Sequence, residues 1–169
     1  MAHPPDIQML HCVCNDAEGG ESLFADGLAL HGALLAAGRP EVLDALRTVR
    51  VPYRYENAQR RFCTERPLLT EDGVQYAPPF QGVLAPGDAA QLAHFYEGCR
   101  LVEALLARGP FCTEFRLQPG HLVLFDNRRL LHGRRAFRLP DAAGARHLVG
   151  GYVDYDDVHA LLRRAGDAA

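Results

Sequence analysis

The hydrophobic pattern first separates short strand-like runs from longer helical ones. "DIQMLHCVC", the segment from Asp6 to Cys14, is largely apolar and is bounded by Pro5 and by the polar stretch "NDAEGGES". This pattern predicts a buried strand. "VPYRYENAQRRF" alternates like a strand from Val51 onward, and "RPLLTEDGVQYA" predicts a hairpin that turns at Asp72-Gly73.

Three more strand-like runs lie in the C-terminal part of the chain: "FCTEFRLQ", "HLVLFDNRRLLH" and "ARHLVGGYVDYDD". In the second run, Leu122 and Leu124 alternate with Val123 and Phe125, so all four positions are apolar. A run of this kind is typical of a strand that is covered on both faces.

Four segments have helical periodicity or helix-end signals. "DGLALHGALLAAG" predicts a short helix that Asp26 caps and Gly38 ends, and "RPEVLDALRTV" predicts a second helix with Pro40 in its first turn. "GDAAQLAHFYEGCRLVEALLARG" predicts one long helix that ends at Gly109, and "DDVHALLRR" predicts a short final helix. The apolar stripe of the long helix consists of Leu92, Phe95, Cys99, Val102 and Leu106.

The order of these elements favours a mainly β fold with helices packed outside. Most predicted strands are joined by hairpins or polar loops, without the regular helical crossovers of a parallel sheet. The sequence contains no GxGxxG, P-loop or GxSxG motif. With 169 residues, we expect one domain.

Composition and charge limit the classes of partner. The formal net charge is −3, so no basic field draws the chain to nucleic acid or to an anionic membrane surface. No apolar run approaches the length that spans a bilayer, and "MAHPPDIQML" lacks the features of a signal peptide. We therefore expect a cytoplasmic protein. Five scattered cysteines without a CxxC pair predict neither a disulfide framework nor a zinc site, and Cys12 and Cys14 are expected to be small buried side chains.

The last predicted strand presents candidate binding residues on one side. By the two-residue period of a strand, Arg146, Leu148, Gly150, Tyr152 and Asp154 point the same way. An arginine and a tyrosine therefore share a face, at most roughly 20 Å apart, and a glycine between them leaves space. A small dicarboxylate and a small substrate could lie end to end along this face.

Two paired segments make the chain recognisable. "PGHLVLFDNRRLLHGRRAF" followed by "RHLVGGYVDYDDVHALLRR" closely resembles the end of the γ-butyrobetaine and trimethyllysine hydroxylases, within the TauD/TfdA group of Fe(II)/2-oxoglutarate oxygenases. "HPPDIQMLHCV" and "GGESLFADG" resemble earlier segments of the same domain, in the same order. The resemblance covers nearly the whole chain. It implies a double-stranded β-helix, a jelly-roll or cupin-like core with outer helices, and a catalytic domain that residues 1–169 contain only in part.

The resemblance also implies residue roles. His132 matches the distal histidine of an iron site with two histidines and one carboxylate. Arg146 matches the arginine that binds the far carboxylate of 2-oxoglutarate, a task that suits a guanidinium because it offers two parallel hydrogen bonds. Ser22 and Leu10 match residues around the same cosubstrate, and Tyr152 matches a tyrosine near the substrate, where an aromatic face attracts a quaternary ammonium.

The implied chemistry is the hydroxylation of a small molecule by Fe(II), O2 and 2-oxoglutarate, with ascorbate as a candidate reductant. The implied partners are small molecules, without nucleic acid or membrane, and a homodimer is one candidate assembly.

The sequence departs from this family at two places. The HxD motif that supplies the other iron ligands would precede the segment matched by "HPPDIQMLHCV", and no HxD or HxE occurs in residues 1–169. His94 with Glu97, or Asp126 with His132, could replace it only with unusual geometry. The family usually has an Asn-Asn pair where this chain has "YAPPFQG", which puts the carnitine-pathway substrates in doubt.

Three hypotheses remain open. The chain is most of the C-terminal catalytic domain of a hydroxylase whose upstream strand is missing, or a catalytically inactive relative that binds 2-oxoglutarate or dimerises, or an unrelated cupin-like binding protein. Each residue also has a structural alternative. His132 could be an ordinary polar residue, Ser22 a turn cap, Tyr152 a packing residue and Arg146 a surface arginine. Arg128, Arg129, Arg134 and Arg135 are expected to form a solvated rim or salt bridges, and not to bind the cosubstrate.

Overall fold

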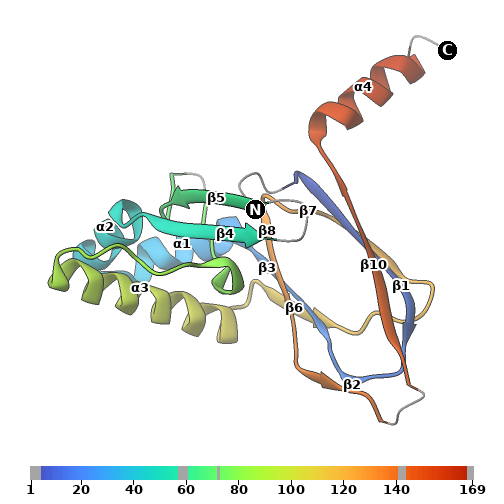
Figure 1. Cartoon of the computed structure of the whole chain (residues 1–169), viewed down its shortest axis with the longest axis horizontal. Coiled ribbons are helices and arrows are strands. Elements are labelled where there is room, and N and C mark those ends of the chain that lie inside the picture. Colours follow the sequence, from blue (N-terminus) through green and yellow to red (C-terminus); the bar gives the residue numbers. More distant parts are fainter. Residues whose placement is uncertain (1–4, 57–60, 72, 141–143, 167–169) are drawn as a thin grey trace. The chain divides into compact units, whose positions relative to one another are not determined.

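The computed structural model describes residues 5–56, 61–71, 73–140 and 144–166. Contacts within the chain divide it into two units. Among the described residues, a helical unit comprises positions 25–112, and a strand unit comprises positions 5–24 and 113–166. Figure 1 labels most elements of both units.

The predicted helix ends are confirmed in the helical unit. Its elements are α1 (Gly27–Ala37), α2 (Pro40–Thr48), β4 (Val51–Glu56), β5 (Arg61–Arg66), the 3-10 turn η1 (Pro78–Phe80) and α3 (Ala89–Arg108). Asp26 caps α1 by accepting from the N–H of Leu28 at 2.9 Å, and the Asp88 carboxylate likewise accepts from Gln91 at 2.8 Å. These bonds satisfy N–H groups that have no partner within the helix.

The core of the helical unit forms where α2 and α3 meet. Leu46 of α2 is fully buried, and a Cβ placed on Gly98 of α3 would lie only 2.6 Å from its side chain. Glycine at this position therefore allows the two helices to approach closely. Phe95 and Val102 of the predicted stripe are also buried, with 2% and 0% of their surface exposed.

The helical unit contains a strand pair that the sequence predicts as a single strand. β4 and β5 pair antiparallel, with Tyr53 opposite Thr64, so the alternating run from Val51 contains two strands and not one. At the predicted turn, an antiparallel bridge joins Leu69 to Val74, the N–H of Thr70 donates to the Gly73 carbonyl at 3.0 Å, and the N–H of Gln75 donates to the Leu68 carbonyl at 2.7 Å, so the chain reverses where the sequence predicts, although Asp72 itself lies outside the described residues. The charged residues of β5 hide its alternation, because the strand is largely exposed.

The strand unit contains the jelly-roll sheets. Its elements are β1 (Ile7–Asn15), β2 (Glu18–Gly19), β3 (Ser22–Asp26), β6 (Cys112–Phe115), β7 (Leu122–Asp126), β8 (Leu130–Arg134), β9 (Phe137–Arg138), β10 (Arg146–Val153) and α4 (Tyr155–Gly166). The last residues of β3 and the first residue of β6 belong to the helical unit. In the described residues, one sheet has the order β10-β1-β7, a second has the order β6-β3-β8, and β2 pairs with β9. The chain passes repeatedly between the two three-stranded sheets, as it does in a jelly roll.

The run "HLVLFDNRRLLH" is not one strand. β7 joins β1 in the first sheet, whereas β8 joins β3 in the second. A turn at residues 127–129 separates them, and the Asp126 carboxylate accepts from the N–H groups of Arg128 at 2.9 Å and Arg129 at 3.1 Å. The turn therefore moves the chain from one sheet to the other just before His132.

The prediction that β7 is covered on both faces is wrong for the described residues. Leu122 and Leu124 are 60% and 61% exposed, whereas Phe125 on the opposite face is 6% exposed. Within the described residues, other side chains cover only the face of β7 that carries Phe125, which contacts Phe24 and His132 from the second sheet. Continuous apolar character does not by itself tell which faces are covered.

Other sequence expectations concern membranes and cysteines. Within the described part of the chain, no helix is both long and apolar enough to cross a membrane. All five cysteines are free thiols. Cys12 is fully buried, as predicted, but Cys14 is only partly buried because the pairing of β1 with β10 shifts between the two residues.

Candidate functional site

His132 projects from β8 into the space between the two three-stranded sheets. Its ring centroid lies 5.0 Å from that of Phe125 in β7 and 6.5 Å from that of Phe24 in β3. Phe24 and Phe125 also contact each other edge to face at 4.9 Å. His132 is an exposed residue, but desolvation by the neighbouring groups lowers the pKa of its imidazole, which favours the neutral form that can donate a lone pair to a metal.

One face of β10 is turned to the same interior space. Gln8 in β1 lies opposite both Phe125 in β7 and Tyr152 in β10. Residues opposite each other in neighbouring strands have side chains on the same face of the sheet. Tyr152 and Gly150 therefore share the face of Phe125, whose ring contacts His132. The same alternation places Arg146 on this face.

Arg146 occupies a crowded and electropositive position at the start of β10. One terminal nitrogen donates to the Gly20 carbonyl at 3.3 Å, and its buried Nε has no hydrogen-bond partner. Burial, and then the nearby charge of Arg134, lower the pKa of the guanidinium, which remains far above neutrality. Gly20 has a φ of 76°, and a Cβ there would lie 3.2 Å from Nε, so a larger residue would crowd this approach.

The remaining predicted site residues lie on elements that face the same space. Ser22 is 5% exposed and lies two residues before Phe24 on β3, so both side chains point to the same side. Leu10 lies opposite Gly150, and its Cδ2 is 3.7 Å from the position of a Cβ on that glycine. Tyr152 is 53% exposed, so its ring is available to a ligand. Ser22 is therefore in a strand, and the alternative of a turn cap does not apply.

The described residues do not form a complete metal site. Among them, no group of three or more His, Cys, Asp or Glu side chains could hold a metal ion. His94 lies within α3, and Glu97 forms an ion pair with Arg39. The Asp126 carboxylate caps the turn that precedes β8. One imidazole, His132, is thus the sole candidate iron ligand on this inner face.

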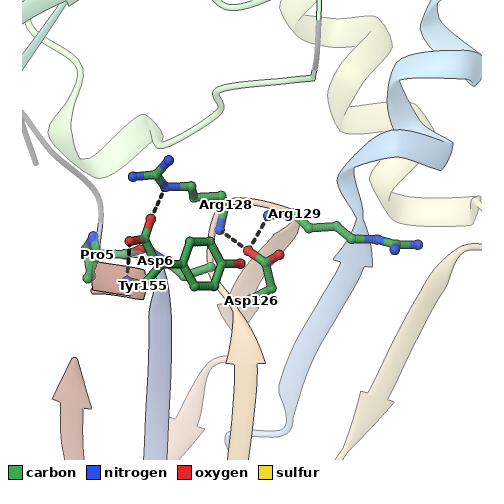
Figure 2. A network of polar contacts seen from close by, with 7 residues as sticks. Pro5, Asp6, Asp126, Arg128, Arg129 and Tyr155 are labelled. Carbon is green, nitrogen blue, oxygen red and sulfur yellow. Dashed lines mark hydrogen bonds and ion pairs between the residues drawn. The ribbon is translucent and has the colours of Figure 1, made fainter. Parts of the chain in front are cut away.

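Asp126 belongs to a polar network at one end of the first sheet (Figure 2). Buried Asp6, just before β1, pairs with Arg128, and its Oδ2 accepts from the N–H of Tyr155 at 2.7 Å. The side chain of Asn127 donates to the Pro5 carbonyl at 2.9 Å. The network therefore joins the start of β1, the turn before β8 and the start of α4.

The arginines near His132 differ in their partners. Arg128 pairs with Asp6, and Arg135 pairs with Glu114 at 2.8 Å, which confirms the predicted salt bridges for these two. The guanidinium of Arg134 instead lies over the ring of Phe137, 4.4 Å from its centroid. Phe137 is the last residue of the motif "PGHLVLFDNRRLLHGRRAF", but no signal in the sequence indicates that its ring contacts Arg134 and Arg146.

Comparison with models of protein families identifies the family of this chain. Residues 1–152 match the family described as "Taurine catabolism dioxygenase TauD, TfdA family". The chain belongs to this family. The resemblance proposed from "PGHLVLFDNRRLLHGRRAF" and "RHLVGGYVDYDD" is thereby confirmed.

Individual relatives give the same result. The chain is 34% identical over 164 residues to gamma-butyrobetaine dioxygenase from Pseudomonas sp. (strain AK-1), a match that covers 91% of this chain and 41% of the relative. It is 31% identical over 149 residues to trimethyllysine dioxygenase from Neurospora crassa, which covers 82% of this chain and 30% of the relative. The TauD-family chain thus spans less than half the length of these curated relatives.

Solved structures support the jelly-roll fold. A crystal structure of asparagine oxygenase in complex with Fe(II), 3-hydroxyasparagine and succinate superposes with a TM-score of 0.63 and 20% identity, covering 95% of this chain and 49% of that chain. At this identity the similarity establishes the fold and not the substrate. The predicted double-stranded β-helix is confirmed at that level.

Proposed function

We propose that this chain forms part of an Fe(II)/2-oxoglutarate-dependent hydroxylase domain, in which Arg146 binds the distal carboxylate of 2-oxoglutarate and His132 supplies one iron ligand. The family supports this reaction class, since curated relatives are named dioxygenases. The observation that carries the proposal is the position of Arg146. Its buried Nε has no partner, and it lies on the β10 face that shares the interior space with His132.

The surroundings of Arg146 fit a dicarboxylate. A partly buried guanidinium without a carboxylate partner favours an anion, and its planar donors match a carboxylate with two hydrogen bonds. Gly150 leaves space on the strand face, and the lack of a side chain at Gly20 lets the Arg146 guanidinium lie close to the backbone there. Leu10 and buried Ser22 offer an apolar wall and a hydroxyl. When bound, iron and 2-oxoglutarate would supply the oxidising chemistry, and this chain's residues would bind and orient the cosubstrate.

The proposed substrate is a small molecule, with a quaternary ammonium group as the first candidate. Two observations support this choice: the names of the curated relatives and the exposed ring of Tyr152 on the cosubstrate face. An aromatic face attracts a quaternary ammonium electrostatically. Whether "YAPPFQG" excludes such a substrate is tested by comparing γ-butyrobetaine with an uncharged isostere in a binding titration.

Binding of 2-oxoglutarate by the Arg146→Ala variant tests the central claim. We expect the variant to bind at least about thirtyfold more weakly than wild type, because about 2 kcal/mol is lost when one partner of a buried charge pair is removed. Arg138→Ala is the matched control, since Arg138 is an exposed arginine that pairs with Glu18 at the surface. Equal affinities of wild type and Arg146→Ala would favour the cupin-like hypothesis.

A non-catalytic 2-oxoglutarate-binding module is the second candidate, because the described residues do not form a complete metal site. Under both hypotheses, we expect the isolated chain to bind Fe(II) weakly, since one imidazole cannot replace three converging ligands. Anaerobic calorimetry with Fe(II) measures this affinity. Tight binding that His132→Ala abolishes would contradict the non-catalytic hypothesis. It would also show that the chain supplies iron ligands besides those recognised among the described residues.

A further inference from the structure

Two arginines converge on one aromatic ring beside the proposed cosubstrate position. The guanidinium carbon of Arg134 lies 4.4 Å from the centroid of Phe137, and that of Arg146 lies 5.1 Å from the same centroid. Arg134 is the last residue of β8, Phe137 begins β9, and Arg146 begins β10. The ring therefore holds cations from two strands that belong to different sheets.

Two arginines of the same segment have carboxylate partners, but Arg134 and Arg146 do not. Arg135 pairs with Glu114, and Arg138 pairs with Glu18. Within the described residues, neither Arg134 nor Arg146 forms an ion pair with a carboxylate; Arg134 donates only to the neighbouring carbonyl of Arg135, at 2.7 Å. The fold thus places two like charges close together without a protein anion between them.

Such an arrangement is costly unless an anion binds there. Like charges repel more strongly the closer they lie. Solvent screens the exposed Arg134, but it screens the partly buried Arg146 less, so part of the repulsion remains. The contact of each guanidinium with the ring of Phe137 recovers part of this cost, since cations are attracted to an aromatic face. A carboxylate that accepts hydrogen bonds from both guanidinium groups would offset the remaining repulsion and would give the unpartnered Nε of Arg146 an acceptor.

We propose that Arg134 is a second cationic arm of the cosubstrate site, which together with Arg146 selects ligands with a distal carboxylate, and that Phe137 positions both arms. This inference rests on the proposed function, because it assumes that Arg146 faces 2-oxoglutarate. It adds a residue that sequence reasoning placed on the solvated rim. It also adds a source of selectivity, since two guanidinium groups discriminate a dicarboxylate from a keto acid with an apolar tail.

The test compares two ligands that differ only at the distal end. 2-Oxoglutarate carries the distal carboxylate, whereas 2-oxopentanoate has the same chain length and ends in a methyl group. Ligand-observed NMR titration of the full chain gives an apparent Kd for each. For Arg134→Gln we expect an affinity for 2-oxoglutarate about tenfold lower than that of wild type, the scale of one charge-assisted hydrogen bond. The affinity for 2-oxopentanoate should stay unchanged.

Matched variants separate recognition from folding. Arg135→Gln removes the adjacent arginine, whose partner is Glu114, and should alter neither affinity. Arg134→Lys keeps the charge but not the planar donors, so it should recover part of the lost affinity. Phe137→Leu should weaken 2-oxoglutarate binding in the same selective manner as Arg134→Gln.

The outcomes distinguish this inference from the proposed function. If Arg146→Ala weakens 2-oxoglutarate binding and Arg134→Gln does not, the second arm is wrong and the proposed function stands. If Arg134→Gln weakens both ligands equally, its role is structural and the inference is likewise overturned. If wild type binds 2-oxoglutarate no better than Arg146→Ala, both proposals fall. A selective loss with Arg134→Gln supports both.

Discussion

The carboxylate of Asp6 accepts a hydrogen bond from the backbone N–H of Tyr155 at 2.7 Å, although 149 residues separate the two positions. Asp6 lies just before β1, and Tyr155 begins α4 directly after β10. The bond therefore fixes the ends of two neighbouring strands whose inner face carries Leu10, Gly150 and Tyr152. Arg128 pairs with the same carboxylate, so the turn that precedes His132 is tied to the same point (Figure 2).

Asp6→Ala should destabilise the strand unit. Asp6 is 5% exposed, and its removal leaves the Tyr155 N–H and the Arg128 guanidinium without this acceptor. Because Arg128 is itself well exposed, we expect a loss of about 1–3 kcal/mol, set mainly by the buried hydrogen bond. Denaturant unfolding measures the change. Asp156→Ala, which removes an exposed acidic residue in the first turn of α4, should change the stability by less than about 0.5 kcal/mol.

Gly150 should tolerate a small side chain but not a large one. A Cβ there would lie 3.7 Å from Leu10, an ordinary contact, so Gly150→Ala should fold with nearly wild-type stability. Gly150→Leu should fill the space between Arg146 and Tyr152 and should weaken 2-oxoglutarate binding about tenfold or more, at little cost in stability on this open face. A binding titration beside a thermal melt checks both claims. If Gly150→Leu binds normally, the ligand does not lie along this face.

Gly151 provides the contrasting case on the other side of the same strand. A Cβ at Gly151 would lie 2.9 Å from the Met9 side chain, so Gly151→Ala requires Met9 to move. We expect a modest loss of stability, below about 1.5 kcal/mol because methionine is flexible, and unchanged 2-oxoglutarate affinity. A change in affinity without a change in stability would show that the two faces are not separated as described.

Alkaline pH should destabilise the helical unit through Tyr53. Burial, as the largest cause, raises the pKa of Tyr53 from 10.0 to about 12, and its hydroxyl donates to the Gln75 carbonyl at 2.8 Å. The unfolded chain ionises near pH 10 while the folded chain stays neutral, so the stabilising contribution is complete below pH 10 and is lost as the pH rises towards 12. This amounts to about 2–3 kcal/mol.

The comparison of wild type with Tyr53→Phe isolates this effect. The chain contains no lysine, so fewer groups titrate in this range, although burial also raises the pKa of Cys99 to about 11. Unfolding free energies measured from pH 8.5 to 12 should fall less steeply in Tyr53→Phe than in wild type. Parallel curves would contradict the assignment to Tyr53.

Gly98→Ala should disrupt the contact between α2 and α3. The added Cβ would lie 2.6 Å from Leu46, which is fully buried and has no free space to move into. The clash should lower the free energy of unfolding by about 1–3 kcal/mol. This loss exceeds the stabilisation that the higher helix propensity of alanine provides. Urea unfolding checks the sign. Gly32→Ala is the matched control in α1, because no atom lies within 4 Å of a Cβ at Gly32, and it should leave stability unchanged or slightly higher.

Local signals in the sequence determined the helices and their ends. Asp26 caps the first turn of α1, and Gly38 and Gly109 follow the last residues of α1 and α3, as predicted; Asp88 caps α3 in the same way. These interactions span only a few residues, so the sequence alone contains the information needed to place them. The motif around His132 and Arg146 likewise identified the family without reference to the fold.

Tertiary structure alone decided which strands share a sheet and which side chains meet. The run "HLVLFDNRRLLH" divides between two sheets, Leu122 and Leu124 face outward, and Phe137 brings Arg134 and Arg146 together. These outcomes depend on pairing between segments far apart in the chain, which contributes no periodic signal to any single segment. A strand's alternation states that it has two faces, but only its neighbours in the sheet determine which face is buried and what lies against it.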